Sequence, residues 1–339
     1  MTQAALARVT ISLFAIPFSL FLFPFQLSSL FQGPPAFRSN TDVVLVPVSV
    51  TDRAGHFVQG LTADQFEVSE GRVRHPITQF SAERVPVSLV ILLDISGSMA
   101  QNQQERAEGE ARWADTRRAL ERLVSRLDAV DEVVFAVFND KVAASPWTHE
   151  HGLILGAFDS LRPGGDTAVL EAVEQVVPVF QRARHPRKVL LLISDGNDTH
   201  IAAAGLPPLP HSIGDQTASG GQWGQAIRTQ VIGAAKAAVR KSEAMAYAIG
   251  MGTRRGVPVD VALLDNLTKE SGGYAEPLRD PAEISAAVAR ICDDLQSQYL
   301  LAFETGNADG QFHAIKVRTR DSRLKVRARA GYVAPGVAP

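Results

Sequence analysis

Apolar residues alternate with other residues over the first stretch of the chain that reads as folded protein. Val43–Val50 shows this alternation, which is typical of a half-buried strand. Pro47 within it favours a strand at the edge of a sheet, because proline has no N–H to donate to a neighbour. Leu61–Phe66 predicts a short helical turn, and further strands are expected at 66–69 and 77–80. The pattern predicts a small β region.

The pattern changes after residue 85 to apolar runs that alternate with amphipathic segments. Leu89–Leu93 is apolar throughout, as expected of a strand buried on both faces of a parallel sheet. Further strands are predicted at 132–138, 188–194 and 244–250, with 142–148 pairing with the first of them. Helices are predicted at 113–127, 153–161, 167–182, 226–241, 259–271 and 281–298. Repeated strand–helix units predict an α/β fold with a doubly wound, mostly parallel sheet.

The last part of the chain returns to strand-like runs. These lie at 299–304, 312–320 and 324–330, separated by turn residues. We expect them to fold with the strands of residues 43–80, so that both chain ends build one small β subdomain. The second and third runs carry many cations, which we interpret as the solvated face of a half-buried sheet, with contact to an anionic surface as the alternative.

Composition and charge narrow the class of protein. The chain of 339 residues has a formal net charge of −2, which argues against bulk affinity for nucleic acid. The only cysteine, Cys292, cannot form an intramolecular disulfide and is expected to be buried in a helix. Ordinary globular composition and this length fit one large domain with a smaller one.

The amino-terminal segment has the composition of an export or membrane signal. Val9–Phe31 contains no charged residue and is rich in Leu, Phe, Ile and Val. It is long for a signal-peptide core and about long enough to span a membrane. A cleaved signal and an uncleaved signal-anchor both remain open. Either predicts a location outside the cytoplasm, secreted or anchored to the membrane.

Oxygen-bearing side chains follow the apolar run Leu89–Leu93. Asp94, Ser96 and Ser98 come directly after it, with Gly97 between the serines. Ligands of open α/β sheets bind at the carboxyl ends of the strands, which is where these residues are expected. Carboxylate and hydroxyl oxygens without His or Cys favour a hard divalent cation over zinc. Alternatively, such residues cap the helix that follows.

Two downstream segments add the same kind of residue. Thr167 follows the turn Gly164–Gly165, and Asp195 follows the apolar strand 188–194. With Asp94, Ser96 and Ser98 they resemble the metal-ion-dependent adhesion site of von Willebrand factor type A domains, written DxSxS, then Thr, then Asp. All five positions of that motif are present, in the order that the family has. The whole layout resembles bacterial exported proteins with related domains.

The resemblance implies a domain plan: signal peptide or anchor at 1–32, linker at 33–41, the type A domain at 85–298, and the β subdomain at 42–84 and 299–335. It also implies a metal site. The five residues would hold Mg²⁺, with Mn²⁺ or Ca²⁺ as alternatives, and an Asp or Glu of a protein partner would complete the coordination. We expect no enzyme and no nucleic-acid partner. The alternatives are a metal-stabilised scaffold of a cell-envelope assembly and a metal-dependent hydrolase.

A long connection after Asp195 is the remaining candidate for function. Residues 200–224 interrupt the expected strand–helix unit and are rich in Pro and Gly. Structureless connections of this length are uncommon unless they are functional or disordered. We therefore expect this loop to contribute to the partner surface, with Trp223 as an anchor, or to be a disordered insertion.

Overall fold

The computed structural model describes residues 43–100, 106–198, 220–252 and 259–336, and the side chains at 98, 100, 106–108 and 220–227 lie outside that description. The predicted signal or anchor, the linker, and most of the 200–224 connection also lie outside it. None of the helices within these described ranges is long and apolar enough to cross a bilayer.

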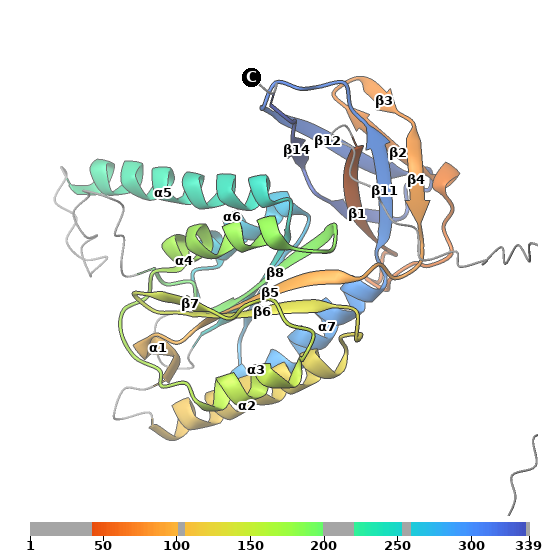
Figure 1. Ribbon diagram of the computed structural model, residues 1–339. Helices are drawn as coiled ribbons and strands as arrows, with labels where there is room; N and C mark the ends of the chain where they lie inside the picture. Colours follow the sequence, from red (N-terminus) through yellow and green to blue (C-terminus); the bar gives the residue numbers. More distant parts are fainter. Residues whose placement is uncertain (1–42, 101–105, 199–219, 253–258, 337–339) are drawn as a thin grey trace, which may run out of the picture. The chain divides into compact units, whose positions relative to one another are not determined.

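A six-stranded sheet forms the centre of the larger part of the fold (Figure 1). Its order is β10-β9-β8-β5-β6-β7, and every neighbouring pair is parallel except β6 with β7. The strands are β5 Val87–Asp94, β6 Glu132–Phe138, β7 Val142–Ala144, β8 Arg187–Ser194, β9 Met245–Met251 and β10 Ala275–Leu278. The fold class predicted from the sequence is confirmed. The short edge strand β10 was not predicted, because Pro277 within it obscures its pattern.

Helices cover both faces of this sheet. They are α1 Gly97–Ala100, α2 Arg106–Ser125, α3 Gly152–Asp159, α4 Val169–Val176, α5 Gly220–Ser242, α6 Val261–Thr268 and α7 Ile284–Gln296. Leu89, Ile91 and Leu93 of β5 pack in one cluster with α2, α3 and α7. Val90 and Leu92 pack in the other cluster with α4, α5 and α6. The unbroken apolar run of β5 thus reflects burial on both sides, and it places the strand's end deep in the fold.

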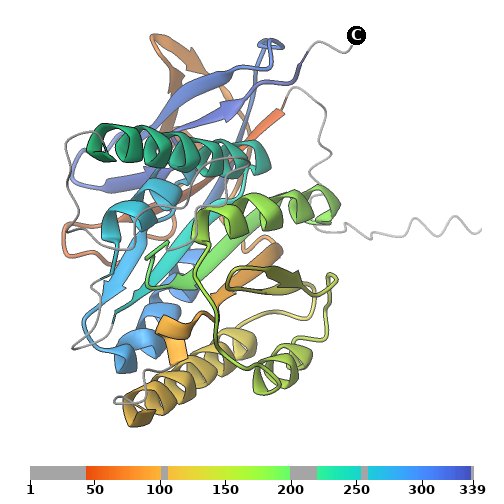
Figure 2. The same cartoon turned by 90° about the vertical axis from the view of Figure 1, so that its left-hand side faces the viewer.

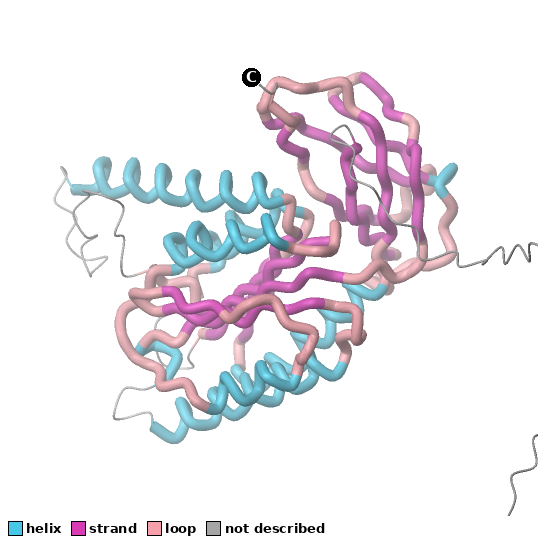
Figure 3. The backbone as a smooth tube through the Cα atoms, in the orientation of Figure 1, coloured by secondary structure: helices cyan, strands magenta, loops and turns pink. Residues whose placement is uncertain are grey.

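The β subdomain consists of two antiparallel four-stranded sheets. Their orders are β13-β1-β11-β4 and β14-β12-β2-β3, so each sheet combines strands from both chain ends. The strands are β1 Val43–Thr51, β2 Phe66–Glu70, β3 Val73–His75, β4 Ile77–Ser81, β11 Tyr299–Glu304, β12 Phe312–Thr319, β13 Lys325–Ala328 and β14 Gly331–Val333. In Figure 3 this part is made of strands and loops with one short helical turn, whereas the long helices surround the central sheet. The predicted β subdomain from both ends is confirmed.

The prediction that β1 is an edge strand is wrong. β1 lies between β11 and β13. Pro47 faces Leu300 of β11, but the pairing with β13 begins only at Val48. Pro47 therefore stands where one side of the strand has no ladder to complete, so its missing N–H costs no hydrogen bond there.

Three helix boundaries differ from the prediction. α2 begins at Arg106, earlier than expected from its apolar positions, because its first turns are polar. The helix predicted to run to Arg182 is α only to Val176 and continues as a 3₁₀ helix, with Pro178 at its start. α5 begins at Gly220, so Trp223 lies in a helix and not in a loop as predicted. The side chain of Trp223 is outside the described part, and its role as an anchor is untested.

A buried polar cluster joins α7 to the β subdomain. The carboxylate of Asp294, fully buried near the end of α7, accepts hydrogen bonds from the hydroxyls of Ser49 and Tyr247 and from the guanidinium of Arg327. Ser49 belongs to β1, Arg327 to β13 and Tyr247 to β9. The contacts therefore link the central sheet, its last helix and the β subdomain. We call these four residues the junction cluster.

Candidate metal site

The strands β5 and β8 place Asp94 and Asp195 at one edge of the sheet. The two strands are parallel neighbours, and Asp94 ends β5 whereas Asp195 directly follows β8. Asp94 is fully buried and Asp195 is 4% exposed. The hydroxyl of Ser194 donates to Oδ2 of Asp94 over 2.6 Å, which ties the two strand ends together. This edge is at the left of Figure 1, and Figure 2 turns it toward the viewer.

The turn after Asp94 is organised by that carboxylate. The N–H of Ser96 donates to Oδ1 of Asp94 over 2.8 Å, and the carbonyl of Ser96 accepts from the N–H of Met99 as α1 begins. Ser96 is fully buried. Ser98 lies within α1, and its side chain is outside the described part. The serine at 96 is thus held beside Asp94 by a backbone bond.

The loop that carries Thr167 is fastened to this turn by backbone hydrogen bonds. Gly164 donates to the carbonyl of Ile95 over 2.7 Å, and Gly97 donates to the carbonyl of Gly165 over 2.9 Å. Thr167 is 3% exposed and lies just before α4. Gly165 has φ +88°, and a Cβ there would lie 3.0 Å from Nδ2 of Asn139. Glycine at this position is required both by the left-handed backbone and by the close approach of Asn139.

Asp195 begins a second fastened loop. Its carboxylate accepts from the N–H of Asn197 over 2.9 Å, and its carbonyl accepts from the N–H of Asp260. Farther along, Oδ2 of Asp198 accepts from the N–H of Leu170 in the first turn of α4. The loops that carry Asp195 and Thr167 are therefore joined through α4. The structure brings the backbones of all three predicted segments to one edge of the sheet.

The electrostatics of Asp94 differ from those of an exposed acid. Burial raises the pKa of Asp94 to about 6, against the opposing hydrogen bonds from Ser194 and Ser96, and the nearby charge of Asp195 raises it further. Across the described ranges, no Lys, Arg or His side chain forms an ion pair with Asp94 or Asp195. Two buried carboxylates thus lie close together without a cation from the described residues.

The donor set fits a hard divalent cation. Carboxylate oxygens of Asp94 and Asp195 and hydroxyl oxygens of Ser96 and Thr167 are the ligand types that Mg²⁺ and Ca²⁺ prefer. Within the described part of the chain, no group of three or more His, Cys, Asp or Glu side chains is arranged to hold a metal. A site rich in histidine or cysteine, as zinc prefers, is therefore not formed by these residues.

Three residues of this edge were not predicted. Ser194 bonds Asp94, Asp198 bonds the start of α4, and Asn139 donates from Nδ2 to the carbonyl of Gly164 over 2.8 Å. Ser194 and Asn139 lie at the carboxyl ends of β8 and β6. Their place directly after predicted strands was the only signal that the sequence offered, and it does not distinguish them from ordinary turn residues.

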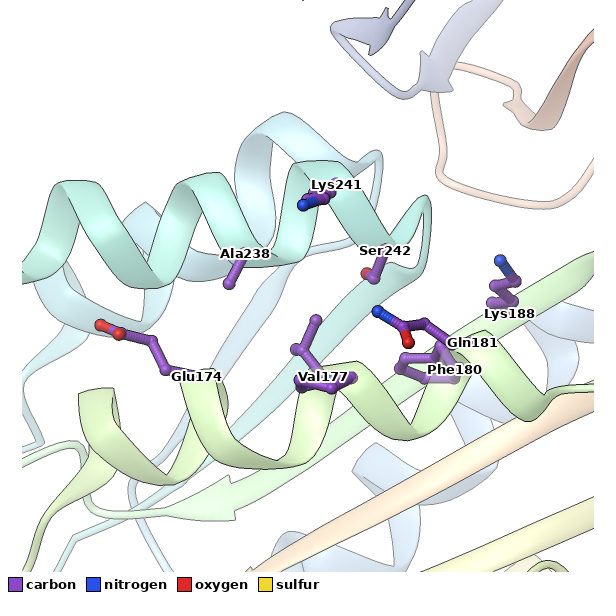
Figure 4. Close-up of a pocket in the computed structure, with 9 residues that line it drawn as sticks. Glu174, Val177, Phe180, Gln181, Lys188, Ala238, Lys241 and Ser242 are labelled. Atoms are coloured by element: carbon purple, nitrogen blue, oxygen red, sulfur yellow. The ribbon is translucent and has the colours of Figure 1, made fainter. Parts of the chain in front are cut away.

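A separate cavity of 290 Å³ lies between α4, the following 3₁₀ helix and α5. Figure 4 shows Glu174 toward one end and Lys188 toward the other, with Phe180 and Val177 between them. Lys188 is the second residue of β8, so this cavity lies at the amino end of a strand whose carboxyl end leads to Asp195. It is not part of the candidate metal site.

Comparisons with known proteins agree with this architecture. Residues 89–197 match the family model described as von Willebrand factor type A domain. No match to a curated protein was found. Similar solved structures include an aerotolerance-related membrane protein from Bacteroides fragilis (19% identity, TM-score 0.44), which covers 62% of this chain and 98% of its own. Another is a von Willebrand factor type A protein from Catenulispora acidiphila (13% identity, TM-score 0.47), and the match covers 88% of this chain and 75% of that one.

A third similar structure is proximal thread matrix protein 1 from the mussel byssus, described with a zinc-occupied MIDAS motif (17% identity, TM-score 0.41), which covers 63% of this chain and 48% of its own. These identities and scores are too low to carry function across. The family model, the parallel sheet covered on both faces and the position of the motif at the strand ends agree with one another. The chain contains a von Willebrand factor type A domain.

Proposed function

We propose that this protein binds a divalent cation, Mg²⁺ in the first place, through Asp94, Ser96, Ser98, Thr167 and Asp195. The bound ion holds an Asp or Glu side chain of a protein partner. The protein is exported, with its amino-terminal segment as a secretory signal or membrane anchor, and it is not an enzyme.

One observation carries the proposal: Asp94 and Asp195 are buried near one another with no cation from the described residues to balance them. A buried acid without such a partner is costly, and the raised pKa of Asp94 expresses that cost. A divalent cation removes it. The hydrogen bonds from Ser194 and Ser96 already fix the orientation of the Asp94 carboxylate, so little rearrangement is needed for binding.

The mixture of ligands explains how an ion at this site would bind a partner. Ser96 and Thr167 contribute neutral hydroxyls, so two carboxylates supply all the negative charge of the protein's donor set. A divalent ion held by this set retains affinity for one more carboxylate, and Mg²⁺ commonly keeps exchangeable waters. The residues of this chain would hold the ion, and the partner would supply its last ligand.

The non-enzymatic proposal rests on the surroundings of the two acids. Among the described residues, the groups bonded to their carboxylates include the hydroxyls of Ser194 and Ser96 and the backbone N–H groups of Ser96 and Asn197. These groups orient a carboxylate but do not serve as a general base. A metal-dependent hydrolase would need such a base within hydrogen-bond reach of an attacking water.

The alternative is a scaffold in which the ion stabilises the fold and contacts no partner. Thermal melts with and without Mg²⁺, on wild type and on S96A/S98A, measure the stabilising effect. Pull-downs from envelope extracts, in Mg²⁺ and in chelator, measure the contact. We expect wild type to be stabilised by Mg²⁺ and to capture a partner only in Mg²⁺. Stabilisation without any cation-dependent partner would favour the scaffold. The absence of both stabilisation and partner capture would contradict the metal site.

A further inference from the structure

A second cavity lies beside the candidate metal site, between α2, the end of α3 and the segment that follows α3. Its volume is 430 Å³. Leu161 and Pro163 line it together with Trp113 and Phe158, whose rings stack with centroids 4.4 Å apart. We call this the α2–α3 pocket. Cavities of this size lined mainly by apolar groups are typical of sites for one or two large side chains or a small molecule.

The wall of the α2–α3 pocket runs directly into the loop that carries Thr167. Pro163 lines the pocket, and the next residue, Gly164, donates to the carbonyl of Ile95 beside Asp94. Pro163 and Thr167 are four positions apart, so their Cα atoms are at most about 15 Å apart. A partner segment of a few residues that reaches the metal is therefore long enough to reach this pocket as well.

The charge at the mouth favours an acidic partner as well. Arg162 is exposed, its guanidinium donates to the carbonyl of Leu161, and it forms no ion pair with any residue that the structure describes. Arg117, by contrast, is held by Asp159 and Glu121. Glu110 lies on the α2 side of the mouth. Of the two cations that line the pocket, Arg162 is the one without an ion pair to a described residue, and it lies next to Pro163, on the side that leads to the Thr167 loop.

We propose that the α2–α3 pocket binds an aromatic side chain of the same partner segment whose carboxylate completes the metal site. This inference rests on the proposed function, because it assumes a partner at the metal. An extended peptide advances about 3.3 Å per residue. The separation along the wall therefore places the aromatic residue within about six residues of the acidic one. Phe, Tyr or Trp fits the pocket best, since an aromatic ring adds contact with the half-buried ring of Trp113 to apolar burial.

The test uses the purified full chain, a phage-displayed library of random peptides and elution with a chelator. We expect the eluted peptides to carry Asp or Glu with an aromatic residue within about six positions. A114W fills the pocket from its exposed α2 wall, and A111W, an equally exposed position one turn earlier on the same helix that does not line the pocket, is the matched control. A114W should weaken binding of the selected peptides by about tenfold or more, and A111W by less than about twofold.

Each outcome decides between the two proposals. Metal-dependent acidic peptides without an aromatic preference, bound equally well by A114W, would overturn the pocket and leave the metal-held partner standing. No metal-dependent peptide at all would overturn both. L161S provides a second variant if melting shows that A114W does not fold. A ¹⁹F NMR titration with 5-fluoroindole then tests the pocket alone: binding should persist in chelator and fall in A114W, and equal binding by wild type and A114W would contradict the proposal.

Discussion

Two buried acidic centres in this molecule are built in opposite ways. In the junction cluster, the carboxylate of Asp294 is met by the guanidinium of Arg327 and by two hydroxyls, all from the protein. At the carboxyl edge of the sheet, Asp94 and Asp195 have only hydroxyl and N–H donors among the described residues. Of the two centres, only the junction cluster has a balancing cation among the described residues.

The difference shows how burial alone fails to identify a functional acid. Asp294 and Asp94 are both fully buried, Asp294 near the end of α7 and Asp94 at the end of β5. A buried charge that the fold neutralises contributes to the arrangement of the structure, whereas one left without a cation needs an ion from outside. The presence or absence of a cationic partner, more than the exposure of the acid, therefore distinguishes the structural centre from the candidate binding site.

Removal of the cation from the junction cluster should have the largest effect. R327M removes the cation bonded to the buried carboxylate of Asp294, with Arg187 left as the other nearby cation, and should lower the free energy of unfolding by about 3 kcal/mol, measured by urea denaturation. R318M is the matched control, because Arg318 is exposed and has no ion pair with a described residue. It should change stability by less than about 0.5 kcal/mol. Equal effects of the two substitutions would break the comparison.

Binding of Mg²⁺ should stabilise the buried acids Asp94 and Asp195, as Arg327 stabilises Asp294. Mg²⁺ at a hundredfold excess over its dissociation constant should stabilise wild type by about 2.7 kcal/mol in the same urea measurement. D195N should lose this gain, and D265N, which removes an exposed acid on α6, should keep it. A gain that survives D195N would place the ion elsewhere.

Removal of charge from the second centre should stabilise the metal-free protein. Because burial raises the pKa of Asp94 to about 6, its ionised form is less favourable in the folded protein than in the unfolded chain. D94N should therefore stabilise the chelator-treated protein at pH 8 by about 2 kcal/mol, while it removes the stabilisation by Mg²⁺. If D94N destabilises the metal-free protein, Asp94 is balanced within the fold and the contrast with Asp294 fails.

The smallest effect is expected in the β subdomain, where His313 contacts the more exposed acids Asp309 and Glu70. His313 bonds Asp309 over 3.0 Å and Glu70 over 2.7 Å, and these bonds and charges raise the pKa of His313. A raised pKa in the fold means that the stabilisation is complete below about pH 6.5 and is lost as pH rises through the raised value.

H313Q should therefore cost up to about 1 kcal/mol at pH 6 and less at pH 9, as measured by thermal unfolding at both values. A loss that does not depend on pH would show that His313 acts through packing against Tyr332, whose ring it stacks on, and not through its charge.

The sequence predicts those parts of the fold whose residues repeat with a clear period. The run Leu89–Leu93 indicates a central strand because burial on both faces removes polar residues from both. The five-residue motif is recognisable since its members lie at the borders of predicted strands and helices. The edge position assigned to β1 was wrong because Pro47 shows only that one N–H is missing, not on which side a neighbour lies.

Contacts between distant segments are beyond such patterns. Arg327 and Arg329 alternate with apolar residues as Arg318 does, and the sequence suggested one solvated face for all three. Arg327 instead bonds Asp294, and Arg329, 7% exposed, bonds Glu243, because β13 lies against the type A domain. The α2–α3 pocket likewise joins residues from two helices and a loop, and no spacing along the chain reveals it.

Isothermal titration of Mg²⁺ into the metal-free full chain tests the central claim most directly. If the two uncompensated acids form an ion site, wild type should take up one ion per chain and D195N should take up none. Saturable binding of the same strength by both proteins, or no binding by wild type in Mg²⁺, Mn²⁺ or Ca²⁺, would contradict it.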